Sequence, residues 1–177
     1  MAAATNPTTG SARLFSFPNP VNEVSARVVA GGVVLLSAAA FITESNWLIA
    51  LIAYGFVARV LTGPTLSPLG QLATRVITPR LHVEPKYVAG PPKRFAQGMG
   101  ATMTVAAAIL AIDIDSWTAA RVLLALVIVA ALLESGFAYC LGCKVFAVLM
   151  RIGVIPESVC EHCNDIWSLG PELARHD

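Results

Sequence analysis

All four cysteines of the chain lie in two C-x-x-C pairs, Cys140 with Cys143 and Cys160 with Cys163, with sixteen residues between the pairs. A thiolate is both a soft metal ligand and a sulfur nucleophile. Two intervening residues allow both sulfur atoms of a pair to reach one metal ion or each other. The spacing therefore predicts a chemically active module of four cysteines, without choosing between these uses.

Three uses of the cysteines remain open from the residues alone. In the first, one or both pairs are catalytic dithiols that exchange electrons or sulfane sulfur with a soluble partner, as a thiol-disulfide oxidoreductase does. Cys140 and Cys143 would be the membrane-proximal pair, and Cys160 and Cys163 the distal pair that meets the partner. Lys144 beside the first pair would favour a thiolate there. In the second, all four hold one structural zinc ion, because their spacing falls within the range of such sites. The third is an iron–sulfur cluster, for which four cysteines suffice in number.

The composition indicates a membrane protein. Of the 177 residues, 56% are hydrophobic and only 13% are charged, which is too apolar for an ordinary soluble domain. The net charge of +1 and the absence of a basic stripe interleaved with aromatic residues give no reason to expect nucleic-acid binding. All three histidines lie outside the apolar stretches, so the sequence excludes a haem held by two histidines within the membrane.

Four apolar stretches predict an all-α bundle of four transmembrane helices, over residues 24–42, 47–61, 95–112 and 117–139. Asn22 is placed to cap the first helix. Residues 42–47 resemble residues 112–117: in each, an acidic turn and a tryptophan separate two apolar runs. This similarity predicts two tandem hairpins, although two interfacial turns of independent origin would look the same.

The long connection between the second and third stretches predicts an amphipathic surface helix. Ser67 reads as its N-cap and Pro68 as its first residue, and Pro79 is expected to stop it. Its apolar face would consist of Leu69, Leu72, Val76 and Ile77. The alternative is a short helix that packs into the core.

The charges predict an orientation in the membrane. Basic residues gather in the connection over residues 62–94 and after residue 140, whereas the two short turns hold Glu44, Asp113 and Asp115. By the positive-inside rule, both termini and all four cysteines would face the cytoplasm across the plasma (inner) membrane. Glu134 lies within the fourth stretch. We expect it to be protonated, to pair with a cation such as Arg59, to belong to a proton path, or simply to lie at the membrane interface.

These patterns divide the chain into three parts. Residues 1–22 are expected to be a flexible lead-in, residues 23–139 a membrane domain, and residues 140–177 a cytoplasmic tail with the cysteines. Within the tail, residues 144–152 predict an interfacial helix, because basic residues seven apart share one face and the others are apolar. His162 lies inside the second pair and could serve as a ligand or move a proton.

Five segments carry a resemblance to a known family: residues 18–23, 56–59, 63–68, 91–97 and 140–143. Through them, residues 17–165 resemble a family of small bacterial multi-pass membrane proteins catalogued as domain of unknown function 4395. The family's association with thioredoxin-like and rhodanese-type proteins implies traffic in thiols or sulfane sulfur. It implies no particular reaction.

The sequence thus favours an integral membrane protein that exchanges thiols or sulfane sulfur with a soluble cytoplasmic partner. Its expected partners are the lipid bilayer, a thioredoxin-like or rhodanese-type protein, and further subunits of an oligomer or larger membrane complex. The alternative is a non-enzymatic anchor or assembly subunit whose tail is folded by zinc or an iron–sulfur cluster.

Overall fold

The structure is a computed structural model that describes residues 17–81, 83–156 and 159. This part of the chain is mostly helical, as the sequence predicts. Its elements, in order, are β1 (Val21–Asn22), α2 (Glu23–Thr43), α3 (Asn46–Thr62), α4 (Pro68–Leu72), the π-helical segment η1 (Ala73–Ile77), α5 (Thr78–Arg80), β2 (Tyr87–Val88), α6 (Gly90–Ile112), α7 (Trp117–Phe137) and α8 (Leu141–Arg151).

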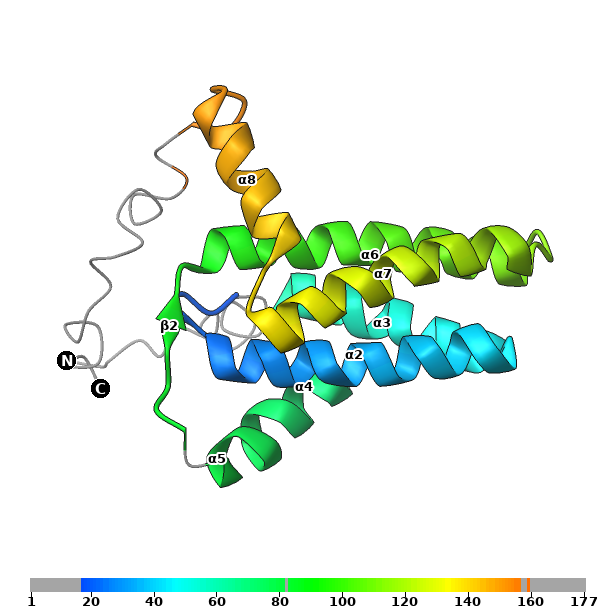
Figure 1. Ribbon diagram of the computed structural model, residues 1–177, viewed down its shortest axis with the longest axis horizontal. Helices are drawn as coiled ribbons and strands as arrows, with labels where there is room; N and C mark the ends of the chain where they lie inside the picture. Colours follow the sequence, from blue (N-terminus) through cyan, green and yellow to red (C-terminus); the bar gives the residue numbers. More distant parts are fainter. Residues whose placement is uncertain (1–16, 82, 157–158, 160–177) are drawn as a thin grey trace, which may run out of the picture.

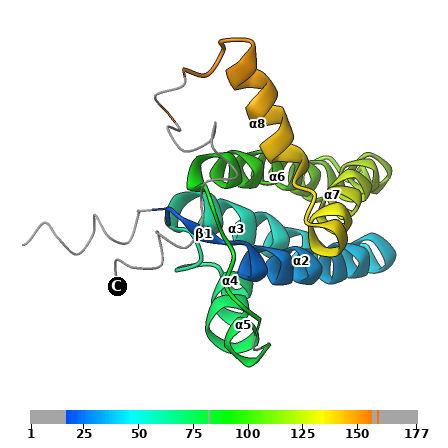
Figure 2. The same ribbon diagram turned by 60° about the vertical axis from the view of Figure 1, so that its left-hand side comes forward.

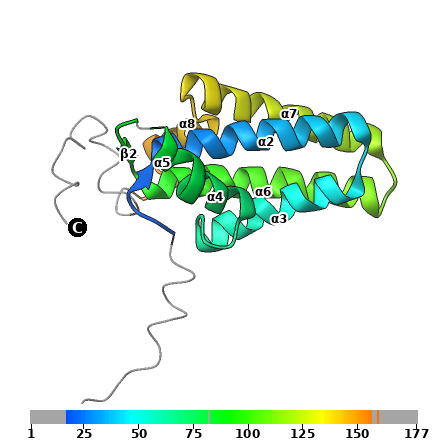
Figure 3. The same cartoon turned by 90° about the horizontal axis from the view of Figure 1, so that it is seen from below.

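The long helices α2, α3, α6 and α7 lie side by side, and each runs antiparallel to the two that it contacts (Figures 1 and 3). Helix α2 contacts α3 and α7, and helix α6 contacts the same two helices from the other side. The turns at residues 44–45 and 113–116 lie together at one end, which we call the distal end. Helix α2 begins and α7 ends at the opposite, proximal end (Figure 1).

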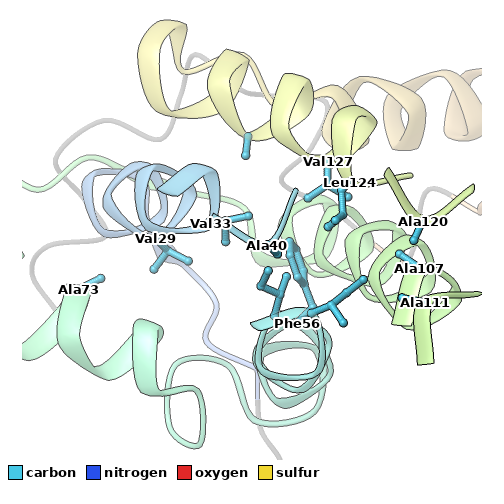
Figure 4. Packing of buried hydrophobic residues seen from close by; sticks show 13 residues of the cluster. Val29, Val33, Ala40, Phe56, Ala73, Ala107, Ala111, Ala120, Leu124 and Val127 are labelled. Carbon is cyan, nitrogen blue, oxygen red and sulfur yellow. The ribbon is translucent and has the colours of Figure 1, made fainter. Parts of the chain in front are cut away.

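Small side chains allow the long helices to approach one another closely. Ala40, Ala107 and Ala120 are fully buried beside Leu124 in the core (Figure 4). The Phe56 ring of α3 lies over Gly100 of α6, where a Cβ atom would overlap the ring. The core is therefore assembled with few large side chains, as is common between helices in membranes.

Three of these helices, α2, α6 and α7, are long and apolar enough to cross a membrane, and α3 is a shorter apolar helix. Their outward faces carry large exposed apolar side chains, among them Leu35, Ile109, Val122, Leu126 and Val129. Soluble monomers rarely expose so many large apolar side chains, and these faces suit contact with lipid. The described helices therefore indicate a membrane protein.

Two helices begin as local chemistry dictates. The Asn22 side chain accepts hydrogen bonds from the backbone N–H groups of Val24 and Ser25, so it caps α2 as expected. Helix α6 starts at Gly90, five residues before the expected start at Phe95. Two consecutive prolines follow Gly90, and the first turn of a helix tolerates proline because the missing N–H would have no partner there.

The segment α4–η1–α5 confirms one sequence prediction and corrects another. Ser67 caps α4 by accepting a hydrogen bond from the Gly70 N–H. However, Pro79 does not stop the helical segment, which continues to Arg80. The chain widens into η1 just before the proline, and Thr78 N–H bonds to the carbonyl of Ala73 five residues back. Pro79 has no backbone N–H, and the wider turn does not require a regular helical hydrogen bond at this position.

The inner face of this segment packs on α2. Ala73 is buried, and Leu69 lies against Gly32, where a Cβ atom would come within 2.5 Å of the leucine side chain. Figures 1 and 2 show α4 and α5 leaving the bundle on one side and α8 leaving it on another, both near the proximal end. Between them, β1 pairs antiparallel with β2, Val21 opposite Val88.

Candidate thiol site and its buried charges

Cys140 and Cys143 form a disulfide at the first turn of α8, with their Cα atoms 5.2 Å apart. Cys140 is the N-cap residue of this helix, and its sulfur accepts a hydrogen bond from the Cys143 N–H at 3.3 Å. The start of a helix carries unpaired N–H groups and a partial positive charge, which stabilise a thiolate. A thiolate released at Cys140 would therefore be held by the helix that it caps.

The two sulfur-bearing residues differ in accessibility. Cys140 is 9% exposed and Cys143 is more exposed than that, although it is not fully open to solvent. Attack on a disulfide depends on which sulfur the incoming thiolate can reach and on how well the other sulfur leaves. This geometry favours attack at Cys143 and departure of Cys140.

Packing against α6 fixes the position of the disulfide. Gly142 lies against Ala96, and a Cβ atom on Gly142 would come within 2.5 Å of the Ala96 Cβ and 2.6 Å of its Cα. One turn later, the buried Phe146 ring packs on the Phe95 ring with centroids 5.6 Å apart. The glycine between the two cysteines is therefore what allows α8 to dock here.

A buried ion pair joins α6 to α7 just before the thiol site. The Lys93 ammonium lies 2.7 Å from a carboxylate oxygen of Glu134, and these side chains are 9% and 18% exposed. Glu134 thus pairs with a cation, which is one of the expected alternatives, but the cation is Lys93 and not Arg59. Lys93 takes that place because the early start of α6 turns it inward, one helical turn before Gln97.

Arg59 is 5% exposed, and it bonds to neutral groups instead. Its Nε donates to the Gln97 side-chain oxygen at 3.0 Å, and its Nη1 donates to the Ser67 hydroxyl at 3.2 Å. The guanidinium also stacks 4.4 Å from the centre of the Phe56 ring. Two buried cations, Arg59 and Lys93, thus share a single nearby carboxylate.

The structure describes only part of the predicted cysteine module. Cys160, Cys163 and His162 lie outside the described residues, so the predicted proximity of the two pairs remains a prediction. Within residues 17–81, 83–156 and 159, no group of three or more histidine, cysteine or acidic side chains could hold a metal ion. The four-cysteine zinc or iron–sulfur site needs the second pair and stays a prediction. Lys144 is exposed, and its ammonium lies 5.8 Å from the centre of the Tyr139 ring.

Sequence reasoning missed three residues that shape this site: Gly142, Ala96 and Lys93. The predicted connection over residues 62–94 includes Lys93, although its place directly after two prolines is a signal for the first turn of a helix. Nothing in the sequence marks Ala96 as the contact of Gly142, because that pairing depends on how α8 turns back.

The family described as "Domain of unknown function (DUF4395)" matches residues 21–151. The chain belongs to this family. The match includes Cys140 and Cys143 and ends nine residues before Cys160. No curated protein and no solved structure matches the chain.

Proposed function

We propose that this protein is a multi-pass membrane protein that exchanges thiols or sulfane sulfur with a soluble partner through Cys140 and Cys143. The observation that carries the proposal is the disulfide at the start of α8, in which the Cys140 sulfur caps the helix and Cys143 is the more exposed residue. The family match supports the first pair as the reactive one, because it includes that pair and ends before the second.

Exchange of electrons proceeds in two steps. A thiolate of the partner attacks the Cys143 sulfur, a mixed disulfide forms, and Cys140 leaves as a thiolate beside the Cys143 N–H. A second thiol of the partner then attacks the mixed disulfide and releases Cys143. The partner becomes a disulfide, and this protein gains two electrons and two protons as a dithiol. The reverse sequence oxidises it again.

The same pair can carry sulfane sulfur. With both cysteines reduced, the Cys143 thiolate takes the outer sulfur of a partner persulfide, and the partner leaves as a thiol. Cys140 then attacks the inner sulfur of the Cys143 persulfide, which restores the disulfide and releases hydrogen sulfide. The two reactions differ in the partner and share the roles of both cysteines.

We place four spans across the bilayer, α3 included, as two tandem hairpins. A neighbour on each side supports α3 as a span despite its length, and such short helices are accommodated by local thinning of the bilayer. The proximal end would face the cytoplasm. Apart from Arg121, the basic residues in the described part of the chain lie toward the proximal end, whereas Glu44, Asp113 and Asp115 lie at the distal end.

In this orientation α8 would lie along the cytoplasmic surface of the membrane. The segment α4–η1–α5 would run toward that surface from the middle of α2, where Leu69 packs on Gly32, to its first turn, where Thr78 bonds to Ser25. Helix α8 has an exposed apolar stripe, Leu141, Val145, Val148 and Ile152, in addition to the face that packs on α6. A helix with such a stripe rests in the lipid interface. The disulfide would then be held at the level of the head groups, within reach of a soluble partner.

Serine substitutions test the roles of the two sulfurs. In Cys140→Ser, the accessible Cys143 can join a partner, and the resolving thiol is absent, so mixed disulfides should accumulate. In Cys143→Ser, the remaining thiol is the buried one, and few mixed disulfides should form. The measurement is the amount of thiol-sensitive conjugate on non-reducing gels of acid-quenched cells.

The second pair needs to be replaced by serine in both variants, so that any conjugate reports on the first pair alone. Equal trapping by the two variants would contradict the assigned roles. No trapping by either one, together with one zinc ion per wild-type chain that is lost when any cysteine is replaced, would favour the anchor over the exchange protein.

A further inference from the structure

A cavity of about 210 Å³ lies between α2, α3 and α4, away from the thiol site (Figure 3 shows the three helices from below). Its walls are almost entirely apolar. The polar side chains in its lining are Arg59 and Ser67, which are hydrogen-bonded to each other. The cavity is smaller than the sites that enclose a whole small molecule, typically about 300–1,000 Å³, so it suits one part of a larger ligand.

The cavity has a polar end and an apolar end along the axis of α3. Leu51, Ile52, Gly55 and Arg59 are spaced to share one face of that helix, and all four line the cavity. Arg59 lies in the last turn, at the proximal end, and Leu51 lies eight residues deeper. At about 1.5 Å per residue this is roughly 12 Å, most of the half-thickness of a bilayer core of about 30 Å. A lipid in one leaflet has the same polarity over the same depth.

The polar end has an unmet need for a negative charge. A guanidinium has five N–H donors, and the bonds of Arg59 to Gln97 and Ser67 use two of them. In the described part of the chain, no carboxylate lies within salt-bridge distance of Arg59, since Glu134 is in contact with Lys93. Arg59 and Lys93 share the one carboxylate of Glu134, so one positive charge is left over, and an acidic ligand group would balance it.

The apolar end opens toward the lipid-facing surface. Leu51 on α3 and Leu72 on α4 line the cavity and are also exposed on the outside of the bundle. Leu69 and the fully buried Ser67 also line the cavity, and Ser67 bonds to Arg59 at its polar end. An acyl chain could therefore enter sideways from the membrane while its head group stays near the start of α4.

We propose that this cavity binds one acyl chain of an anionic phospholipid, whose phosphate accepts hydrogen bonds from Arg59. Guanidinium groups bind phosphate oxygens with two parallel hydrogen bonds. A zwitterionic lipid also has a phosphate, but its head group has less net negative charge to balance Arg59. The lipid would tie α4 to α2 and α3 and complete the charge balance at the proximal end. This inference concerns a site separate from the cysteines and does not depend on their reaction.

The test uses the full chain in nanodiscs that contain phosphatidylglycerol and phosphatidylcholine in equal amounts. After release into detergent, native mass spectrometry counts the lipids that remain bound. We expect one retained phosphatidylglycerol per chain. Loss of the charged hydrogen bonds in Arg59→Gln should reduce this retention by about tenfold or more.

A second variant fills the cavity and keeps the charged residue Arg59. A Cβ atom on Gly55 would lie 3.6 Å from Arg59 Nη1 and 3.9 Å from the Ser67 oxygen, in ordinary contact, so Gly55→Leu extends a side chain into the ligand space. Gly31→Leu is the matched control, because no atom lies within 4 Å of a Cβ atom there. Gly55→Leu should abolish the retained lipid, and Gly31→Leu should keep it.

Three outcomes would overturn the proposal. They are equal retention of phosphatidylcholine and phosphatidylglycerol by the wild-type chain, unchanged retention in Gly55→Leu, and unchanged retention in Arg59→Gln. Circular dichroism of each variant checks that the helices are formed. The thiol chemistry of Cys140 and Cys143 checks independently that the proximal end is folded.

Discussion

The substitution Gly142→Ala should detach the thiol site from the bundle. The added Cβ would lie 2.5 Å from the Ala96 Cβ and 2.6 Å from the Ala96 Cα, whereas carbon atoms in contact rest about 3.5–4.0 Å apart. Helix α8 or α6 must therefore move by roughly 1 Å or more. Because one of the two obstructing atoms belongs to the backbone, a change of rotamer cannot relieve the overlap. Overpacking of this kind destabilises by about 1–3 kcal/mol.

Thermal unfolding in detergent, followed by circular dichroism, measures the loss of stability, and the rate of disulfide reduction by dithiothreitol measures access to the sulfurs. We expect a lower midpoint and faster reduction for Gly142→Ala. The matched control is Gly98→Ala in α6, where no atom lies within 4 Å of a Cβ atom. Its midpoint should stay the same or rise, because alanine favours a helix over glycine by up to about 1 kcal/mol.

A second-site change sharpens this test. Ala96→Gly removes one of the two atoms that obstruct the new methyl group and leaves the other, so it should restore part of the lost stability of Gly142→Ala. If Gly142→Ala has the same unfolding midpoint and the same rate of disulfide reduction as Gly98→Ala, α8 does not dock on α6 through this glycine, and the reasoning is wrong.

Three further predictions concern the charges and one cap. Glu134→Met should destabilise the protein more than Lys93→Met, since the first leaves two buried cations and the second leaves a carboxylate near Arg59. A broken buried pair is expected to cost about 3–5 kcal/mol. In chemical unfolding, the double variant should recover much of this loss. The pair of Arg121 with Glu44 is 41% and 43% exposed, so Glu44→Ala should change stability by less than about 1 kcal/mol, and a larger change would contradict this assignment. Asn22→Ala should cost about 0.5–2 kcal/mol through loss of the α2 cap, whereas Asn22→Asp should be tolerated; equal unfolding midpoints would refute the role of the cap.

The sequence predicts local features of this protein well, because they depend on neighbouring residues. Asn22 and Ser67 cap the helices that they were expected to cap, and the apolar runs mark the long helices to within a few residues. The errors arise where two local signals compete. Pro91 and Pro92 were placed in a loop, but they begin α6, and Pro79 was expected to end a helix that widens to include it.

What depends on distant contacts could not be predicted from the sequence. The cysteine spacing identifies a reactive pair, but the difference in exposure between Cys140 and Cys143 arises from the docking of α8 on α6. In the same way, Glu134 was recognised as a charge in need of a partner. Whether that partner is Arg59 or Lys93 is decided by the rotation of α6, which no local pattern reports.

The central claim is that Cys140 and Cys143 act as an exchangeable pair at the membrane, and the redox state of the pair tests it most directly. Intact cells are quenched with acid, free thiols are alkylated before and after reduction, and the peptide with both cysteines is quantified by mass spectrometry, with metal content measured on the purified protein. We predict that the pair shifts between disulfide and dithiol when cells receive a thiol oxidant or reductant, and that the protein holds no stoichiometric zinc. A pair that never changes state, in a protein with one zinc ion per chain, would contradict the account.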